Sequence, residues 1–97
     1  MKILAIIPCY NEEESIQNTI ENLKEKTPGI DFIVVNDGSK DNTCSICIEN
    51  NYPVIDLPFN LGLSNAVQTG MRYAYNNGYD MALQFDGDSQ QDLVYIP

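Results

Sequence analysis

Residues 81–88 read Met81-Ala82-Leu83-Gln84-Phe85-Asp86-Gly87-Asp88. The run is largely apolar as far as Phe85, as in a buried strand of a parallel sheet, and two carboxylates follow it directly. Open α/β sheets bind their ligands at the carboxyl ends of such strands. Carboxylate oxygens are hard ligands that suit Mg²⁺ or Mn²⁺, and these ions keep open positions for phosphate oxygens. The stretch therefore predicts a strand that ends in one half of a metal and diphosphate site.

Three more apolar runs indicate strands, at residues 3–7, 32–35 and 54–57. Between the runs, apolar residues recur with helical spacing. The first helical stripe is Ile16, Ile20 and Leu23, and the last comprises Leu63, Ala66, Val67, Gly70, Met71, Ala74 and Tyr75. The element order β-α-β-α-β-α-β with right-handed crossovers predicts an α/β fold, an open, mostly parallel, doubly wound sheet.

Polar residues after the strands indicate where the helices begin. Asn11, with Glu14 three positions later, resembles a capping box. Asp41 and Asn60 are of the residue types that cap helix N-termini, and they precede the second and third helical segments. We therefore expect helices to begin close after these three positions.

Charge and length limit the classes of function. The 97 residues carry 14 acidic and 5 basic side chains, a net charge of −9. Such a chain is not expected to bind nucleic acid or anionic lipid by charge attraction. We interpret residues 1–97 as one small domain, and the apolar run at 3–7 is too short for a signal-peptide core or a membrane span. A cytoplasmic location is expected, and membrane association of a longer parent protein is left open.

Three cysteines, Cys9, Cys44 and Cys47, form an odd set. The spacing of Cys44 and Cys47 is that of a redox or zinc half-site, but the chain has no second pair and no histidine to complete a zinc site. On the second helix these two cysteines share an apolar stripe with Ile48. We interpret them as small core residues.

Two further polar loops, residues 8–12 and 36–41, follow the first and second strands. In a parallel sheet both loops lie at the same edge as the paired carboxylates. Tyr10 offers a flat face to a base, Asp37 offers acceptor oxygens to ring N–H groups, and Gly38 allows the backbone to approach a ligand closely. These features predict a nucleotide pocket, which neither a P-loop nor a dinucleotide fingerprint explains.

The ordered motifs resemble family 2 glycosyltransferases with the GT-A fold. They are Pro-Cys-Tyr-Asn-Glu at 8–12, Val-Val-Asn-Asp-Gly-Ser-Lys-Asp-Asn-Thr at 34–43, Asn-Leu-Gly at 60–62, Gly70, and Phe-Asp-Gly-Asp-Ser-Gln at 85–90. The Gln-Phe-Asp-Gly-Asp stretch is closest to the branch that includes dolichol-phosphate mannose synthases. The resemblance covers nearly the whole chain, which is similar to the N-terminal, nucleotide-binding half of such an enzyme.

The resemblance implies a role for five residues in nucleotide binding. Pro8 and Tyr10 match the segment that lines the nucleobase pocket, and Glu12 matches a residue near the ribose. Asp37 matches the acid that hydrogen-bonds the base, and Asp86 lies against the nucleotide's diphosphate. The donor implied is a UDP- or GDP-sugar.

The resemblance also implies a metal site and a reaction. Asp86 and Asp88 match the DxD pair that holds Mg²⁺ or Mn²⁺, and Gln90 matches a position that completes the metal shell. The sugar would pass to an acceptor such as a polyprenyl phosphate or a saccharide. The family's catalytic base and acceptor site match no residue here, so we assign no base and expect the isolated 97 residues to transfer little or no sugar.

Three positions depart from the family pattern. Asn36 stands where many members carry a second aspartate, Ser64 where a basic residue is common, and Gln91 where a histidine is frequent. These departures concern the phosphate contacts and the donor preference.

Each assignment has a structural alternative. Asp86 and Asp88 would also serve as solvated caps after the strand, and Asp37 with Ser39 would also form an ordinary turn. Tyr10 would also pack on the sheet edge. For the chain as a whole, a non-catalytic nucleotide-binding module and a nucleotidyltransferase-like domain are the alternatives, and self-association through apolar surface is expected.

Overall fold

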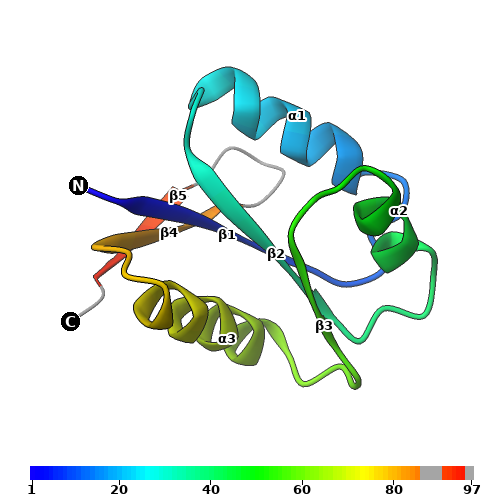
Figure 1. The fold of residues 1–97 in the computed structure, drawn as a ribbon. Helices are drawn as coiled ribbons and strands as arrows, with labels where there is room; N and C mark the ends of the chain where they lie inside the picture. Colours follow the sequence, from blue (N-terminus) through cyan, green and yellow to red (C-terminus); the bar gives the residue numbers. More distant parts are fainter. Residues whose placement is uncertain (86–90, 96–97) are drawn as a thin grey trace.

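The computed structural model describes residues 1–85 and 91–95. A single sheet of five strands runs through the molecule in the order β3-β2-β1-β4-β5, with helices on both faces (Figure 1). Along the chain the elements are β1 (Ile3–Cys9), α1 (Ile16–Lys26), β2 (Asp31–Asp37), α2 (Thr43–Glu49), β3 (Val54–Leu57), α3 (Leu63–Asn76), β4 (Met81–Phe85) and β5 (Gln91–Tyr95).

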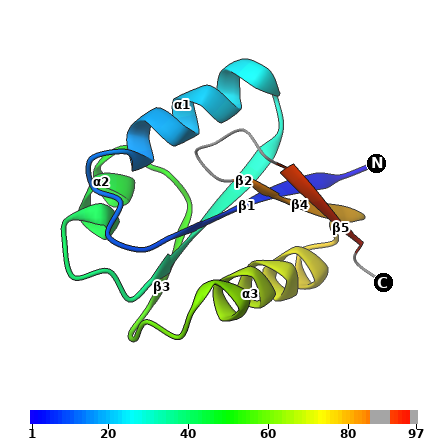
Figure 2. The ribbon, with the colours of Figure 1, turned by 180° about the vertical axis from the view of Figure 1, so that it is seen from behind.

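Strands β1 to β4 are parallel to one another, and β1 lies between β2 and β4. Helices α1 and α2 cover one face of the sheet and α3 covers the other, as both ribbon views show (Figure 2). The doubly wound α/β fold expected from the sequence is confirmed. All three parallel crossovers bring the carboxyl ends of their strands to one edge of the sheet.

Strand β5 is the element that the sequence did not predict. It pairs antiparallel with β4 in a register that places Gln91 opposite Phe85 and Tyr95 opposite Met81. The expected order stopped at the fourth strand because residues 91–95 show no long apolar run. Their strand conformation satisfies the backbone hydrogen bonds of the open edge of β4, which is a tertiary effect.

The core has two layers, one on each face of the sheet. Alternate residues of β1 point to opposite faces, so Ala5 and Ile7 meet α1 and α2, while Leu4 and Ile6 meet α3. The stripe expected on α1 is confirmed, because Ile16, Ile20 and Leu23 are all buried. The α1 layer contains Ala5, Ile7, Cys9, Ile16, Ile20, Leu23, Val34, Cys47, Tyr52, Leu83 and Phe85, and the α3 layer contains Leu4, Ile6, Ile33, Val35, Ala66, Ala74 and Ala82.

Helix α3 packs on the sheet through small residues. Ala66, Gly70 and Ala74 are its buried positions, whereas Leu63 and Tyr75, at the ends of the predicted stripe, are exposed. The stripe was therefore correct in its centre and wrong at both ends. The small side chains let the helix axis come close to β1.

One of the three expected helix starts is wrong. Helix α1 begins at Ile16 after Ser15, and Asn11 adopts a left-handed backbone conformation with φ 52° in place of capping. The start close after Asn60 is confirmed, because helix α3 begins at Leu63, with Gly62 at the cap position. The start near Asp41 is confirmed, because a carboxylate oxygen of Asp41 accepts a hydrogen bond from the N–H of Thr43 (3.0 Å). The loop that contains Asn11 makes longer-range hydrogen bonds that a capping pattern does not reveal.

The expected stripe on α2 is correct for the cysteines and wrong for Ile48. Cys47 is fully buried and Cys44 partly buried, whereas Ile48 is 62% exposed. Within the described residues, none of the helices has the length and apolar character needed to cross a lipid bilayer.

Candidate functional site

The carboxyl ends of β1 and β2 lie side by side because the two strands are paired in parallel register, Cys9 opposite Asn36. The loops that follow them, residues 10–15 and 38–42, therefore meet at one edge of the sheet. Strand β4 ends at the same edge, since it pairs in parallel with the other side of β1. Two of the three segments that the sequence predicted to converge, residues 8–12 and 36–41, meet here, and the third, residues 86–88, lies outside the described residues.

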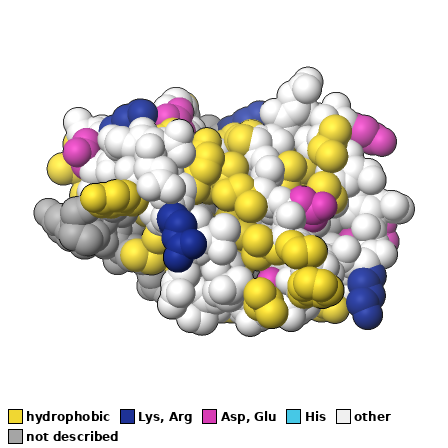
Figure 3. Space-filling model, turned by 60° about the horizontal axis from the view of Figure 1, so that its bottom comes forward, with side chains coloured by type: hydrophobic (Ala, Val, Ile, Leu, Met, Phe, Trp, Pro, Cys, Tyr) yellow, Lys and Arg dark blue, Asp and Glu magenta, His cyan; other side chains and the backbone are white. Residues whose placement is uncertain are grey.

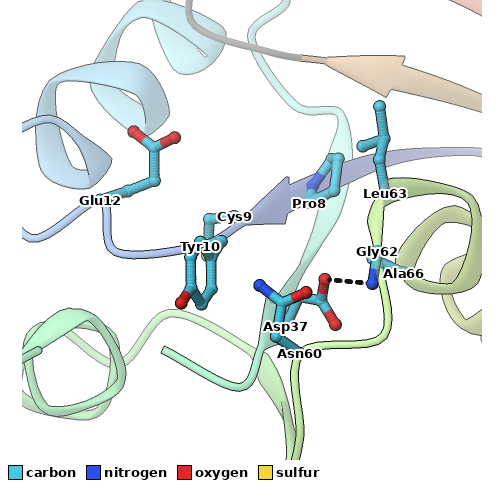
Figure 4. A pocket seen from close by; sticks show the side chains of 9 residues that line it. All are labelled: Pro8, Cys9, Tyr10, Glu12, Asp37, Asn60, Gly62, Leu63 and Ala66. Carbon is cyan, nitrogen blue, oxygen red and sulfur yellow. Dashed lines mark hydrogen bonds between the residues drawn. The ribbon is translucent and has the colours of Figure 1, made fainter. Parts of the chain in front are cut away.

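A pocket of about 310 Å³ opens at this edge (Figure 4). Four residues predicted to bind nucleotide, Pro8, Tyr10, Glu12 and Asp37, line it. The remaining lining residues are Cys9, Asn60, Gly62, Leu63 and Ala66. The sequence reasoning did not assign these five to the pocket, although the Asn-x-Gly element at 60–62 was a signal that could have indicated the loop before α3.

The pocket has two walls with Asp37 between them. Figure 4 shows Tyr10 and Glu12 on the side formed by the end of β1, and Gly62, Leu63 and Ala66 on the opposite side. We call residues 10–12 the first wall and residues 60–63 the second wall. Tyr10 is 41% exposed, so its ring is available at the mouth of the pocket.

Asp37 is buried, with only 4% of its surface exposed. Its two carboxylate oxygens accept hydrogen bonds from the second wall. One oxygen accepts a hydrogen bond from the N–H of Leu61 and the other from the N–H of Gly62, each at 3.0 Å. Two N–H donors stabilise a carboxylate that burial would otherwise disfavour. Each oxygen keeps a further lone pair for a ligand.

Among the described residues, the pocket lining carries two carboxylates, Glu12 and Asp37, and no lysine or arginine. Its polar groups are therefore mainly acceptors, which match a ligand that presents N–H or O–H donors. Burial raises the pKa of the Cys9 thiol well above its ordinary value, and the neighbouring Cys47 adds a smaller increase in the same direction. This shift favours the neutral thiol form of Cys9, which is the less nucleophilic form.

Three exposed apolar side chains lie in or next to the second wall in the chain. Phe59, Leu61 and Leu63 are each at least 60% exposed. The space-filling view shows hydrophobic side chains gathered on the face of the molecule that carries α3, with few lysine and arginine side chains among them (Figure 3).

The departure at Asn36 has a structural reason. Asn36 is buried, and its side-chain N–H donates to a carboxylate oxygen of Asp56 on the neighbouring strand β3 (2.9 Å). Its side-chain oxygen accepts from the hydroxyl of Ser39. An aspartate at position 36 would face the carboxylate of Asp56, so the amide avoids a repulsive pair.

The predicted metal ligands Asp86, Asp88 and Gln90 lie outside the described residues. Within residues 1–85, no three histidine, cysteine, aspartate or glutamate side chains form a cluster that could hold a metal ion. Asp86 follows Phe85, the last residue of β4.

The model of the family described as glycosyl transferase family 2 matches residues 4–91. The chain belongs to glycosyl transferase family 2. The resemblance seen in the sequence motifs is therefore confirmed, and the family consists of glycosyltransferases. The nucleotidyltransferase-like alternative is not favoured.

Two curated relatives in the glycosyltransferase family have informative names. The poly-β-1,6-N-acetyl-D-glucosamine synthase of Staphylococcus aureus (strain COL) is 35% identical over 100 residues, which cover 96% of this chain and 24% of that protein. The UDP-N-acetylglucosamine–dolichyl-phosphate N-acetylglucosaminyltransferase of Methanococcus voltae is 39% identical over 105 residues, covering 91% of this chain and 41% of that protein. The chain thus spans about a quarter to two fifths of the length of these relatives.

Solved structures show the same fold. S. aureus TarS (residues 1–349) in complex with UDP superposes with a TM-score of 0.73 at 27% identity, over 91% of this chain and 28% of that chain. The mannosyltransferase PcManGT from Pyrobaculum calidifontis, in complex with GDP-Man and Mn²⁺, superposes with a TM-score of 0.76 at 22% identity, over 90% and 27%. The GT-A fold expected for this glycosyltransferase chain is confirmed.

Proposed function

We propose that the chain is the nucleotide-sugar-binding part of a family 2 glycosyltransferase, and that its pocket takes the nucleoside end of a UDP- or GDP-sugar. The observation that carries the proposal is the pocket at the carboxyl edge, which brings Pro8, Tyr10, Glu12 and Asp37 together. Ligand pockets commonly measure roughly 300–1,000 Å³. A pocket of about 310 Å³ is at the lower end of that range, which suits a nucleoside better than a whole nucleotide-sugar.

Four residues of the pocket have a chemical task in this proposal. The exposed ring of Tyr10 stacks on the base. Asp37 accepts a hydrogen bond from a ring N–H through the lone pairs that Leu61 and Gly62 leave unused. The carboxylate of Glu12 accepts from the ribose hydroxyls, and Pro8 contributes apolar contact. The names of the two relatives and the UDP bound to TarS support this kind of donor.

The diphosphate needs a positive partner that the pocket lining does not provide. Asp86, Asp88 and Gln90 offer two carboxylates and an amide oxygen, a donor set that fits Mg²⁺ or Mn²⁺. When bound, the ion supplies Lewis-acid stabilisation of the departing nucleoside diphosphate. The Mn²⁺ in the PcManGT complex supports this assignment.

The acceptor in this proposal is a polyprenyl phosphate or a growing saccharide. The first is supported by the name of the M. voltae relative and the second by that of the S. aureus relative. No residue of this chain is assigned as the catalytic base. We accordingly expect donor binding without rapid sugar transfer by the 97 residues.

Calorimetric titration of UDP and GDP, each with and without Mn²⁺, tests the proposal. We expect the wild-type chain to bind one nucleotide in a metal-dependent manner. The Asp86→Ala, Asp88→Ala double variant should lose the metal dependence, while Asp80→Ala, a matched acid at the opposite end of β4, should not. Binding of neither nucleotide to the wild type would contradict the proposed function.

A further inference from the structure

Both walls of the pocket are attached to one segment of the chain, residues 36–43 between β2 and α2. We call this the support segment. The first wall is hydrogen-bonded to Ser39, Lys40 and Thr43 of this segment, and the second wall is hydrogen-bonded to Asp37. Tyr10 and Leu63 lie on opposite sides of the pocket (Figure 4). The attachment of both walls to one segment therefore sets the width of the pocket between them.

Asn11 makes a reciprocal pair of hydrogen bonds with the support segment. The N–H of Asn11 donates to the hydroxyl of Ser39 at 2.8 Å, and the side-chain oxygen of Asn11 accepts from the N–H of Lys40 at 2.9 Å. Asn11 lies between Tyr10 and Glu12, the two side chains that form the first wall. We call this pair of hydrogen bonds the latch.

Two more hydrogen bonds continue the attachment after the latch. The N–H of Glu12 donates to the hydroxyl of Thr43 at 2.9 Å, and the N–H of Glu13 donates to a carboxylate oxygen of Asp41 at 3.2 Å. Thr43 is fully buried, so its hydroxyl is a fixed acceptor. Three successive backbone N–H groups, at positions 11 to 13, thus end on side chains of the support segment.

The second wall is attached independently. Asp37 accepts from the N–H groups of Leu61 and Gly62, and the backbone of Gly38 lies directly under residues 59 and 60. A Cβ on Gly38 would lie 2.4 Å from the backbone nitrogen of Asn60. Opening the latch should therefore release the first wall alone.

We propose that Asn11 is a positioning residue for the nucleotide: it holds Tyr10 and Glu12 at a set distance from the second wall by latching the first wall to the support segment. The inference rests on the proposed function. It gives Asn11 a role that replaces the helix-capping role expected from the sequence.

Asparagine suits this position for two reasons. Its backbone φ of 52° lies in the left-handed region, which asparagine, aspartate and glycine tolerate better than other residues. Its side-chain oxygen supplies the acceptor for Lys40. Glycine would keep the backbone conformation and lose the acceptor, whereas aspartate would keep both.

The test compares Asn11→Gly and Asn11→Asp with Asn51→Gly. Asn51 is a matched control because it is exposed, has φ 58° and lies outside the described lining of the pocket. Two quantities are measured for each protein: amide hydrogen exchange by NMR, and the Kd of UDP and GDP with Mn²⁺. The thermal midpoint is recorded alongside, so that loss of folding is detected.

In Asn11→Gly we expect faster exchange at the N–H of Lys40 and unchanged exchange at Leu61 and Gly62. The Kd should rise about five-fold, the equivalent of one ordinary hydrogen bond. Asn11→Asp should restore both quantities, and Asn51→Gly should leave both unchanged.

The exchange measurement tests the latch, and the Kd measurement tests the positioning role, so each part of the proposal can be contradicted separately. Unchanged exchange at Lys40 in Asn11→Gly would overturn the latch, and faster exchange with an unchanged Kd would overturn the positioning role. A wild-type chain that binds neither nucleotide would contradict the proposed function, and the exchange of Lys40 would still decide whether Asn11 holds the first wall.

Discussion

Gly70 of α3 lies directly against Ile6 of β1: a Cβ on Gly70 would lie 2.4 Å from Cγ2 of Ile6. Ile6 is fully buried, so its side chain has little room to move away. The absence of a side chain at Gly70 therefore sets how closely α3 approaches the sheet. The second wall of the pocket begins at the N-terminal end of the same helix.

Replacing Gly70 with alanine should destabilise the fold. Overpacking a core costs about 1–3 kcal/mol, while alanine gains only about 1 kcal/mol over glycine in helix propensity. We expect a net loss of about 1 kcal/mol in the free energy of unfolding, measured by urea denaturation. Gln68→Ala, on the exposed side of α3, is the control and should leave stability nearly unchanged. A Gly70→Ala protein more stable than the wild type would show that Ile6 can repack.

Alanine substitutions at Gly38 and Gly78 distinguish the cost of backbone strain from the cost of a steric clash. Both have positive φ values, 70° and 77°, but a Cβ would meet the backbone of residues 59 and 60 at Gly38 and nothing within 4 Å at Gly78. A left-handed alanine costs roughly 1–2 kcal/mol, so Gly78→Ala should lose about that much. Gly38→Ala should lose more, because backbone atoms must also move. Equal losses in urea denaturation would mean that the second wall shifts without resistance.

Asp37→Asn should weaken the second wall. An amide keeps one acceptor oxygen, but its NH₂ group would face the N–H of Leu61 or Gly62. Leaving a buried group unsatisfied costs about 1–3 kcal/mol, so we expect a loss of that size in stability and faster amide exchange at residues 61 and 62. Asp31→Asn, on the exposed end of the same strand, is the matched control. Retained protection of both amides in Asp37→Asn would contradict the assigned contacts.

The stability that the carboxylate of Asp41 contributes should depend on pH in the acid range. Desolvation acts to raise the pKa of its carboxyl, but the hydrogen bonds from Thr43 and from the N–H of Glu13 lower it by more, so the net shift is downward. A carboxyl with a lowered pKa contributes stability that is present above its unfolded pKa and is lost as the pH falls through the folded value.

We therefore expect the amide of Glu13 to lose protection as the pH falls below the ordinary carboxyl pKa of about 4. In Asp41→Asn this pH dependence should be absent. The measurement is hydrogen exchange of Glu13 across the acid range, corrected for the intrinsic rate. A wild-type profile that matches the variant would exclude Asp41 as the cause.

The strands could be predicted because each is a short apolar run bounded by polar residues. Buried parallel strands need apolar side chains on both faces, and this requirement is visible in residues 3–7 and 32–35 without any tertiary information. The edge strand β5 lacks that signal, because its conformation depends on the backbone of β4. The same distinction applies to α1, whose start depends on where the preceding loop is held and not on a local cap.

Half of the pocket could be predicted in the same way. Pro8, Tyr10, Glu12 and Asp37 follow parallel strands, and chain topology alone brings the ends of such strands together. The roles assigned to these residues, and to Asp86, Asp88 and Gln90, remain predictions. The second wall was not predicted, because β3 is at the far edge of the sheet and only folding brings residues 60–63 back over Asp37.

The sequence by itself determined the doubly wound fold and the edge at which the pocket lies, since both follow from local patterns of apolar and polar residues. Only the tertiary structure decided how the pocket is shaped. Asp37 bonds to Leu61 and Gly62, and Asn11 bonds to Ser39 and Lys40, across separations of 24 to 29 residues. Hydrogen bonds over such separations depend on the mutual placement of whole strands and loops, so no local pattern encodes them.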